Sequence, residues 1–474
     1  MKLSWREKLS YGIGATGKDM VCGLVFTYAL IYFTDVAMLP EAFVGVLFFV
    51  AKLWDAVNDL AMGTIVDNTR TKFGKFRPWL VIGTLVNAVV FVILFTDFGL
   101  DTGGKMVFVS ILYVLWGMTY TMMDIPYWSM LPNLATDPHE RETVSVIPRI
   151  FASIGGNFIV GGLGLAIIGT LGKKGPEGGM NQLGMTRFAW IIAIVFVVTI
   201  GITVLNVKSA DTVQGQTQEK TTFKQMFHII AKNDQLLVAI GVILTFNLAI
   251  QIMNSVSTFY FIYVTHSTTL FGTFTLLAGV AEVIGLFLFP ALAKRLSRTK
   301  IYFLACACPV AGLLLLGAIS YAAPQNIVLT GLAGFLVKLG SGFSLGTVTV
   351  VLADVVDYGE YKFGTRNESV TFSTQTLVVK LSSAVGALLT GGALQLTGYI
   401  PQAAVQTAAT LTGLRVIMIV IPIVCAIVSF VLYKTKFKLN GEYYQRIMNV
   451  LALRNNKLDE HLEDMAENPD QIIR

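Results

Sequence analysis

The sequence is poor in charged residues, which make up 14% of the chain, whereas hydrophobic residues make up 54%. Ordinary soluble domains carry roughly a quarter of charged residues. A soluble protein of 474 residues could not bury so much apolar surface, because single cores stop growing at about 250–300 residues. The shortage of charge therefore excludes an ordinary soluble globule and predicts a membrane protein.

Cysteine and histidine are also scarce, with four of each. The closest pair of cysteines, Cys306 and Cys308, lies in an apolar run and is best explained as small core residues. The chain shows no nucleophile–base pair and no metal-ligand spacing, so we expect neither an enzyme nor a bound cofactor. The net charge of +6 lies in short clusters between apolar runs, which is typical of membrane loops rather than of nucleic-acid binding.

A membrane-spanning helix needs about 20 mostly apolar residues, and the chain holds twelve such runs. They lie near 9–36, 41–66, 78–98, 105–132, 142–171, 185–207, 233–264, 268–293, 301–322, 325–355, 369–397 and 411–435. A long polar connection divides them into six plus six. We therefore predict an all-α membrane protein with two six-helix bundles, 1–207 and 233–435, a central loop with an amphipathic helix at 208–232, and a tail at 436–474.

Lysine and arginine are unevenly shared between the two sets of alternating loops. One set, which includes both ends of the chain, holds eighteen of them and the other holds four. The excess of positive charge predicts that both termini are cytoplasmic. In the tail, Tyr444, Ile447, Met448 and Leu451 recur with helical spacing, so this segment is expected to lie on the membrane surface or against the bundle.

Several predicted spans contain ionisable side chains. Each costs roughly 3 kcal/mol at the centre of a membrane helix, so eight would cost on the order of 20 kcal/mol if they were unpaired. They must therefore face one another, water or a ligand; salt bridges that only hold helices together are the alternative explanation. The eight are Lys18, Asp19, Lys52, Asp55, Asp59, Asp124, Arg149 and Lys380.

The spacing of the acids suggests a cation site. Asp55 and Asp59 are four residues apart and share a helix face, with Asn58 beside them. Asp124 shares a face of another span with Thr121. Carboxylate, amide and hydroxyl oxygens are ligands for a hard cation, and clustered acids also raise proton affinity. Sodium and a proton are both chemically suitable.

A second chemistry is also present. Asp19 and Asp124 could accept hydrogen bonds from sugar hydroxyls, and Trp128 could stack on the apolar face of a sugar ring. Arg149 and Lys380 would balance the acids when no cation is bound. Glu282 is a lone acid in the eighth predicted span, and it is expected either to couple a second ion or to pair with a neighbour.

Six motifs carry a resemblance to a known family. They are Lys18-Asp19, the segments 54–59, 75–79, 116–121 and 123–128, and Asp354-Val355-Val356-Asp357-Tyr358-Gly359-Glu360. With these, the chain resembles the glycoside–pentoside–hexuronide:cation symporters of the major facilitator superfamily. The resemblance implies two pseudo-symmetric bundles in the bacterial inner membrane that import a galactoside or oligosaccharide, such as melibiose, with Na⁺, or with H⁺ or Li⁺. A cytoplasmic regulator of the phosphotransferase system is a further implied partner.

The resemblance also implies roles for individual residues. The cation site would be Asp55, Asn58, Asp59 and Thr121. The sugar site would be Lys18, Asp19, Tyr120, Asp124, Trp128, Arg149, Thr376 and Lys380. The cytoplasmic gate, on charged loops, would be Arg141, Asp354, Asp357, Glu360 and Arg366.

Departures from the family pattern at Phe26, Leu345, Lys52 and Glu282 favour a roomier pocket for a different or longer galactoside. The alternative function is an antiporter or uniporter of the same fold for another small polar metabolite. A sugar receptor without transport is a further alternative, but it would be expected to carry a sizeable soluble signalling domain.

Overall fold

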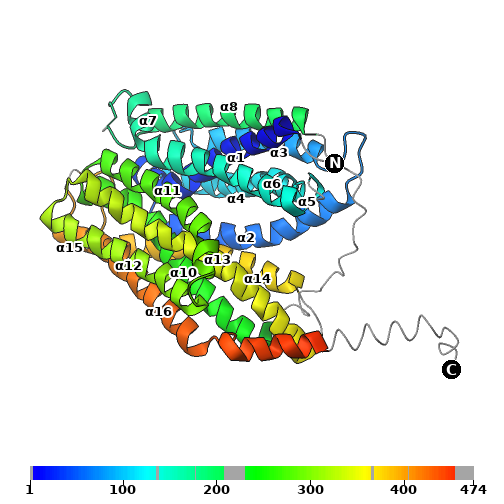
Figure 1. The fold of residues 1–474 in the computed structure, drawn as a ribbon. Coiled ribbons are helices and arrows are strands. Elements are labelled where there is room, and N and C mark those ends of the chain that lie inside the picture. The colour runs from blue at the N-terminus through cyan, green and yellow to red at the C-terminus, as the bar shows by residue number, and fades with distance from the viewer. Residues whose placement is uncertain are drawn as a thin grey trace.

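The structure is a computed structural model that describes residues 4–134, 138–176, 178–207, 230–364, 368–403 and 405–453. The regular elements of this part of the chain are all helices, arranged in two halves that Figure 1 shows one above the other. The N-terminal half contains α1 (Trp5–Ile31), η1 (Tyr32–Val36), α2 (Glu41–Asn68), α3 (Arg77–Leu94), α4 (Thr102–Ser129), α5 (Leu131–Leu134), α6 (Pro138–Ser153), η2 (Ile154–Gly162), α7 (Leu163–Leu171) and α8 (Gln182–Asn206).

The C-terminal half repeats the arrangement. It contains α10 (Asp234–Phe259), η3 (Tyr260–Val264), α11 (Thr268–Ala293), α12 (Arg298–Ala322), α13 (Ile327–Phe363), α14 (Glu368–Leu396), α15 (Ala408–Arg415), η4 (Val416–Val420) and α16 (Ile421–Lys436). A last helix covers residues 441–453. Within the described ranges, eleven helical segments are long and apolar enough to cross a membrane. With α2, which has the length of a span and carries embedded charges, they match the twelve predicted spans.

Short polar residues begin several of these helices. Their side chains accept a hydrogen bond from a backbone N–H in the first turn, which would otherwise lack a partner. Such caps are Ser4, Asp101, Asn181, Asn233, Ser267 and Asn326.

One predicted boundary was wrong. The tenth span was expected to end near residue 355, with Asp357 and Glu360 in a loop, but α13 continues to Phe363. The helix ends at Gly364, whose φ of 72° is the left-handed conformation that glycine adopts without strain. The two acids therefore lie on a rigid helix that extends past the apolar segment.

The tail helix packs against the C-terminal half, which decides between the two expected placements. Ile447 and Leu451 are buried in a cluster with Tyr433 and Phe437 of that half, whereas Met448 is exposed. Of the predicted amphipathic helix in the central loop, residues 208–229 lie outside the described residues.

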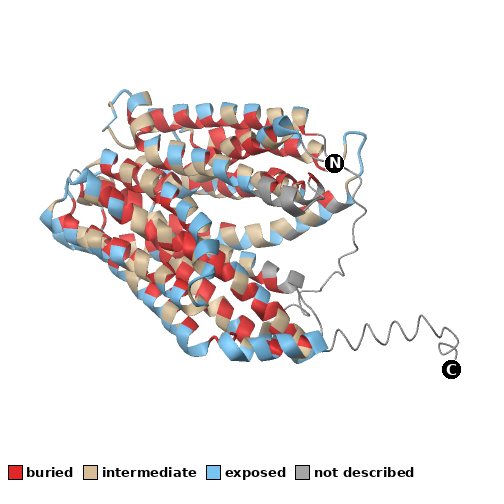
Figure 2. Cartoon of the chain, in the orientation of Figure 1, coloured by how far each residue is buried: buried red, intermediate tan, exposed pale blue. Residues whose placement is uncertain are grey.

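The start of α1 and the end of α16 lie on one side of the molecule, here called the terminal side (Figure 1). The opposite side, which holds α15 and the far ends of α1 and α10, where the chain continues into η1 and η3, is called the far side. Buried residues line the faces where helices meet, and exposed residues cover the outward faces (Figure 2). Many of these exposed side chains are large and hydrophobic, among them Val198, Phe287 and Val424, as expected for helices that face lipid.

The halves pack against each other through glycine. A Cβ at Gly391 of α14 would lie 2.6 Å from the carbonyl oxygen of Glu41 and 3.0 Å from the Cα of Gly45, both on α2. A Cβ at Gly272 of α11 would collide with the carbonyl oxygen of Gly162 in η2. Small residues let membrane helices approach to backbone contact, so these positions join the halves near the far side.

Candidate functional site

Lys18 is the centre of a charged cluster between α1 and α4. Its side chain is 4% exposed, and its Nζ lies 2.7 Å from Oδ1 of Asp124 and 3.2 Å from Oδ2 of Asp19. The side chains of both acids are 29% exposed. The ammonium is therefore paired and buried, while each acid keeps part of its surface open to a ligand.

Aromatic rings surround the same ammonium. Lys18 Nζ lies 5.0 Å from the ring centroid of Trp128, 5.6 Å from that of Tyr127 and 5.8 Å from that of Tyr120. At these distances the rings attract the cation. The structure thus brings together five residues of the predicted sugar site: Lys18, Asp19, Tyr120, Asp124 and Trp128.

Two tyrosines that the sequence reasoning missed hold this cluster in place. The rings of Tyr11 and Tyr127 stack with centroids 4.6 Å apart. Tyr11 Oη donates to the carbonyl oxygen of Tyr127, at 2.9 Å, and Tyr127 Oη donates to that of Tyr11, at 2.5 Å. This reciprocal pair fixes α1 against α4. In the sequence, the only indication that Tyr127 belongs to the site was its position next to Trp128.

The predicted cation-site residues meet where α2 packs against α4. Thr121 Oγ1 donates to Oδ1 of Asp59 over 3.1 Å. One turn before Thr121, a Cβ at Gly117 would lie 2.5 Å from Oδ1 of Asp55, so only glycine leaves room for that carboxylate. Asn58 has a buried amide nitrogen without a hydrogen-bond partner. The four residues therefore line one helix–helix contact.

Each carboxylate of this group is held by a lysine. Lys52 Nζ lies 3.2 Å from Oδ2 of Asp55, and Lys380 of α14 forms an ion pair and hydrogen bond with Oδ2 of Asp59. In the described ranges no three acid, cysteine or histidine side chains are grouped to hold a metal ion. The two ammonium groups thus neutralise the two carboxylates of the predicted cation site.

Lys380 also connects the two halves of the molecule, because Asp59 belongs to α2 and Lys380 to α14. Thr376 lies one turn before Lys380 with an exposed side chain. Arg149 is exposed on α6, and in the described structure no hydrogen bond or ion pair joins it to the Lys18 cluster. Of the two basic residues expected to balance the acids, the structure therefore brings only Lys380 into contact with one.

The predicted gate residues Asp354, Asp357 and Glu360 lie on the terminal side, and two of them bind partners within their own half. Asp354 is 2% exposed and forms an ion pair with Arg298. Asp357 accepts a hydrogen bond of 2.8 Å from Tyr444 Oη in the tail helix. Burial and this carboxylate raise the pKa of Tyr444 far above its usual value, so the phenol stays protonated. Arg366 and the side chain of Arg141 lie outside the described residues.

The far side carries a polar cluster that sequence reasoning missed. Asp35 of η1 is 4% exposed. Its carboxylate accepts hydrogen bonds from Tyr399 Oη, at 2.6 Å, and from Tyr263 Oη, and Gln402 donates to its backbone oxygen. Asp35 belongs to the N-terminal half and its three partners to the C-terminal half, so the cluster ties the halves together.

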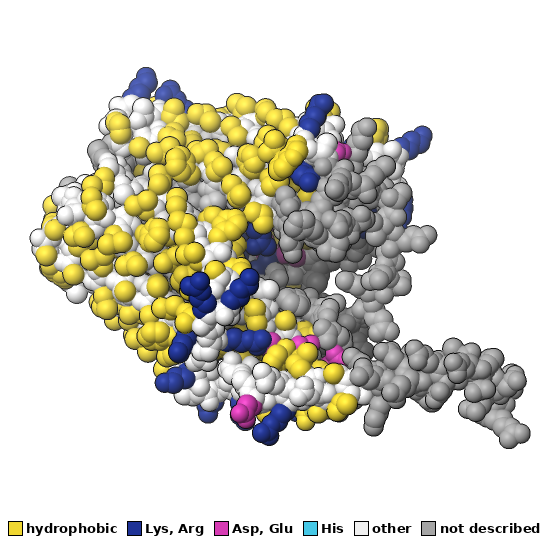
Figure 3. All heavy atoms as spheres, viewed as in Figure 1, with side chains coloured by type: hydrophobic (Ala, Val, Ile, Leu, Met, Phe, Trp, Pro, Cys, Tyr) yellow, Lys and Arg dark blue, Asp and Glu magenta, His cyan; other side chains and the backbone are white. Residues whose placement is uncertain are grey.

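The far side is therefore closed and the halves diverge toward the terminal side. Thr258 of α10 donates to the backbone oxygen of Thr27 on the same far part of the molecule, over 3.2 Å. In Figure 3 the surface is hollowed between the two halves, with Lys and Arg side chains at the rim of the recess.

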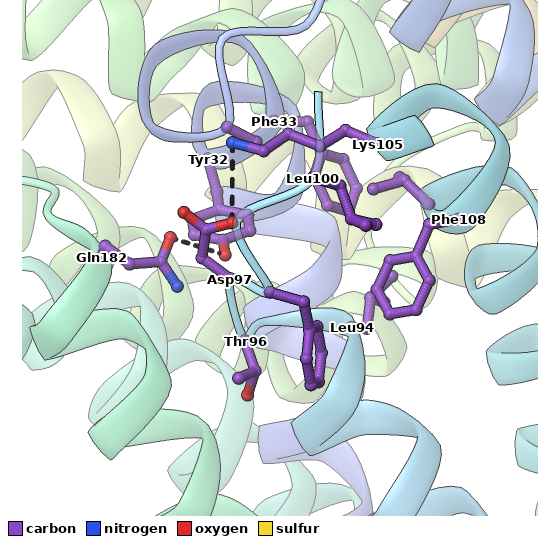
Figure 4. Close-up of a pocket in the computed structure, with 12 residues that line it drawn as sticks. Tyr32, Phe33, Leu94, Thr96, Asp97, Leu100, Lys105, Phe108 and Gln182 are labelled. Carbon is purple, nitrogen blue, oxygen red and sulfur yellow. Dashed lines mark hydrogen bonds and ion pairs between the residues drawn. The ribbon is translucent and has the colours of Figure 1, made fainter. Parts of the chain in front are cut away.

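A small cavity near the far side is separate from this recess (Figure 4). Its volume is about 30 Å³, which holds about one water molecule. Tyr32 donates to Gln182 over 2.9 Å at its edge, and Lys105 Nζ lies 3.6 Å from Oδ1 of Asp97. It is too small for a sugar, and its lining includes none of the predicted site residues.

Comparison with known proteins agrees with this geometry. A family model described as "MFS/sugar transport protein" matches residues 10–441. The chain belongs to this family of sugar transporters. The expected glycoside–pentoside–hexuronide symporter family is thereby confirmed, and the protein is a multi-pass membrane transporter rather than an enzyme.

Three transporters named for the sugars they carry are similar to this chain over most of its length. The lactose permease of Lactobacillus delbrueckii subsp. bulgaricus is 29% identical over 95% of this chain and 73% of its own length. The isoprimeverose transporter of Lactiplantibacillus pentosus is 29% identical over 89% of this chain and 86% of its own. The raffinose carrier protein of Pediococcus pentosaceus is 28% identical over 97% and 74%.

Solved structures support the fold alone. A nucleoside transporter matches with a TM-score of 0.65 and 13% identity, covering 90% of this chain and all of its own. An inward-facing bacterial homologue of a lysosomal transporter, Spinster, matches with a TM-score of 0.63 and 15% identity, covering 92% and 97%.

Proposed function

We propose that this sugar transporter is a cation-coupled symporter that carries a galactoside or oligosaccharide, such as melibiose, inward with Na⁺. The observation that carries the proposal is the pairing of Asp59 with Lys380 across the two halves, beside a second ammonium–carboxylate cluster around Lys18. One cluster suits a cation and the other suits a sugar, and they meet on α4. Both termini would then lie in the cytoplasm of a bacterium, with the protein in its inner membrane.

The sugar would bind at the Lys18 cluster. Asp19 and Asp124 keep accessible carboxylate surface and accept hydrogen bonds from hydroxyl groups, whereas Lys18 donates. The ring of Trp128, which is partly exposed, can stack on the apolar face of the sugar. Because Lys18 is already fixed by its two acids and three rings, this site would be pre-organised before the sugar arrives.

The cation would bind between α2 and α4. Oxygen atoms of Asp55, Asn58, Asp59 and Thr121 form the set that a hard cation prefers. Na⁺ at this place would displace Lys380 from Asp59, and a proton on Asp59 would break the same ion pair. Either event releases a contact between the halves, which gives the cation a direct effect on their relative position.

Transport would follow from alternation between two arrangements of the halves. The structure is closed at Asp35 and open toward the terminal side. With both termini in the cytoplasm, as proposed, this would be the state that releases its cargo to the cytoplasm. In the opposite state the predicted gate residues on the terminal side would close the recess. A membrane potential of about 100 mV supplies roughly 2.3 kcal/mol per cation, enough for about a 50-fold sugar gradient. A cytoplasmic regulator of the phosphotransferase system remains a predicted partner.

The test is sugar binding to the purified protein in lipid membranes, with a panel of galactosides and glucosides in the presence of Na⁺, Li⁺ or neither. We expect Na⁺ to tighten the binding of one glycoside, and Asp59→Cys to abolish this effect. Asp97→Asn is the matched control, because Asp97 forms an ion pair away from the site.

Each other outcome is informative. Binding that ignores Na⁺ but depends on pH would make the protein a proton symporter. Failure to bind any glycoside would refute the sugar assignment and leave the alternative of an antiporter or uniporter for another polar metabolite.

A further inference from the structure

The C-terminal half contains an embedded ion pair that the proposed sugar and cation sites do not use. Glu282 on α11 and Lys338 on α13 lie with Nζ and Oε2 3.4 Å apart. Their side chains are 34% and 17% exposed. Glu282 thus pairs with a neighbour, one of its two expected roles. Because each such charge costs roughly 3 kcal/mol in a membrane helix, a pair of this kind indicates function.

Glu282 faces the interior of the molecule and not lipid. The large exposed hydrophobic residues of α11, Val280, Ile284, Phe287 and Leu288, mark its lipid-facing side. At 3.6 residues per turn, Glu282 lies roughly 120–160° around the helix from each of them. Its partly exposed carboxylate therefore opens toward the space between the helices.

The same face of α11 leads to the Lys18 cluster. Gly279, one turn before Glu282, packs against η2, since a Cβ there would lie 2.8 Å from the Cβ of Asn157. The preceding residue of η2, Gly156, packs against α1, where its Cβ would lie 3.2 Å from the backbone oxygen of Asp19. A single helical segment, η2, thus separates α11 from the α1 backbone at Asp19.

The pair also occupies a position that corresponds to part of the proposed cation site. Asp55 is the fifteenth residue of α2, and Glu282 is the fifteenth residue of α11. Likewise, Gly117 is the sixteenth residue of α4, and Gly342 is the sixteenth residue of α13. A Cβ at Gly117 would touch the side chain of Asp55, and a Cβ at Gly342 would touch the backbone oxygen of Glu282. Glu282 is therefore the C-terminal counterpart of Asp55.

The counterpart lacks the other ligands of a metal cation. By the same correspondence, Asn58, Asp59 and Thr121 are replaced by Gly285, Leu286 and Gly346. None of these supplies a side-chain oxygen, so a second sodium site of the same design is excluded. What remains is one carboxylate and one ammonium, the same two groups that Lys18 and Asp124 offer to sugar hydroxyls.

We propose that Glu282 and Lys338 form a second hydroxyl-binding pair, which binds the outer sugar unit of a glycoside whose first unit lies at the Lys18 cluster. The inference rests on the proposed sugar transport. It makes the pair a determinant of substrate length: a single sugar unit would use the Lys18 cluster alone, whereas a disaccharide would use both.

The test compares the binding of methyl α-galactoside and of the disaccharide melibiose to Glu282→Gln and Lys338→Met in lipid membranes with Na⁺. Each variant loses a hydrogen bond to a charged group, so we expect about a 10- to 100-fold loss of disaccharide affinity. Monosaccharide affinity should stay within about twofold of the wild type. Glu282→Asp keeps the charge and should retain part of the disaccharide affinity, and Asp97→Asn is the control.

The outcomes separate this inference from the proposed function. If the wild type binds neither these two probes nor any other glycoside of the panel above, the proposed function fails. If the wild type binds both and Glu282→Gln leaves the ratio of the two affinities unchanged, the second site is refuted while sugar transport stands. A change in pH dependence or in cations bound per sugar, without a change in that ratio, would make the pair a proton site and also overturn the inference. Glu282→Asp provides the same comparison if Glu282→Gln does not fold.

Discussion

The hydrogen bond from Tyr399 to Asp35 is predicted to set the balance between the two arrangements of the halves. It is 2.6 Å long, buried, and made to a carboxylate. Hydrogen bonds to charged groups contribute about 1.5–3 kcal/mol. Because this one joins the N-terminal to the C-terminal half, it stabilises only the state that is closed on the far side. Tyr399→Phe should therefore shift the equilibrium roughly 10- to 100-fold toward opening on the far side.

The shift can be measured as a distance across the far side. Spin labels at Phe98→Cys and Val405→Cys, which are 55% and 81% exposed, report on the two halves by pulsed electron resonance once the native cysteines are replaced. We expect Tyr399→Phe to add a population with a longer distance. Burial and Asp35 hold the pKa of Tyr399 far above its usual value, so the phenol keeps the proton that it donates.

Tyr28→Phe is the matched control. It removes a buried tyrosine hydrogen bond of similar length, 2.8 Å to the backbone oxygen of Val160, but both residues belong to the N-terminal half. Its distance distribution should equal that of the wild type. The reasoning is refuted if Tyr399→Phe leaves the distribution unchanged, or if Tyr28→Phe shifts it as much.

Three further perturbations follow from the packing. Gly272→Val should also favour opening on the far side, because its side chain would collide with the η2 backbone, whereas Gly392→Ala, with open space around it, should have no effect in the same distance measurement. Ile447→Ala should lower the free energy of unfolding by about 2–5 kcal/mol, whereas Met448→Ala, at an exposed position, should leave thermal unfolding in detergent unchanged. Lys18→Met should abolish glycoside binding and also lower the melting temperature, because it leaves two carboxylates without their shared ammonium; unchanged binding would contradict the proposed sugar site.

The twelve spans could be predicted from the sequence because long apolar runs have few alternatives in a membrane protein. The end of α13 was harder to predict from the sequence. Its last part is polar, so hydropathy falls near residue 355, yet the helix continues until Gly364 allows the left-handed turn. Hydropathy reports where lipid ends, whereas backbone conformation decides where a helix ends.

The site was predicted only as a set of residues. Lys18 and Asp19 are adjacent in the chain, whereas Lys380 and Asp59 are separated by 321 positions in the sequence. Their pairing depends on how α2 and α14 are rotated about their axes, which the sequence does not specify. The sequence reasoning paired neither Lys52 with Asp55, although they are three apart on one helix, nor Asp35 with its tyrosines. Asp35 lies at the end of an apolar run, and its partners Tyr263 and Tyr399 come from the other half, so sequence position alone does not reveal the contact.

The lysine pairing around α2 has an electrical consequence. Lys52 with Asp55 and Lys380 with Asp59 sum to zero charge, so these groups carry no net charge through the membrane field when the protein returns without cargo. A bound monovalent cation adds one elementary charge, on which about 100 mV acts with roughly 2.3 kcal/mol. In the proposed symport the loaded inward step would therefore carry one elementary charge more than the empty return step, so the voltage would favour net uptake at a polarised membrane.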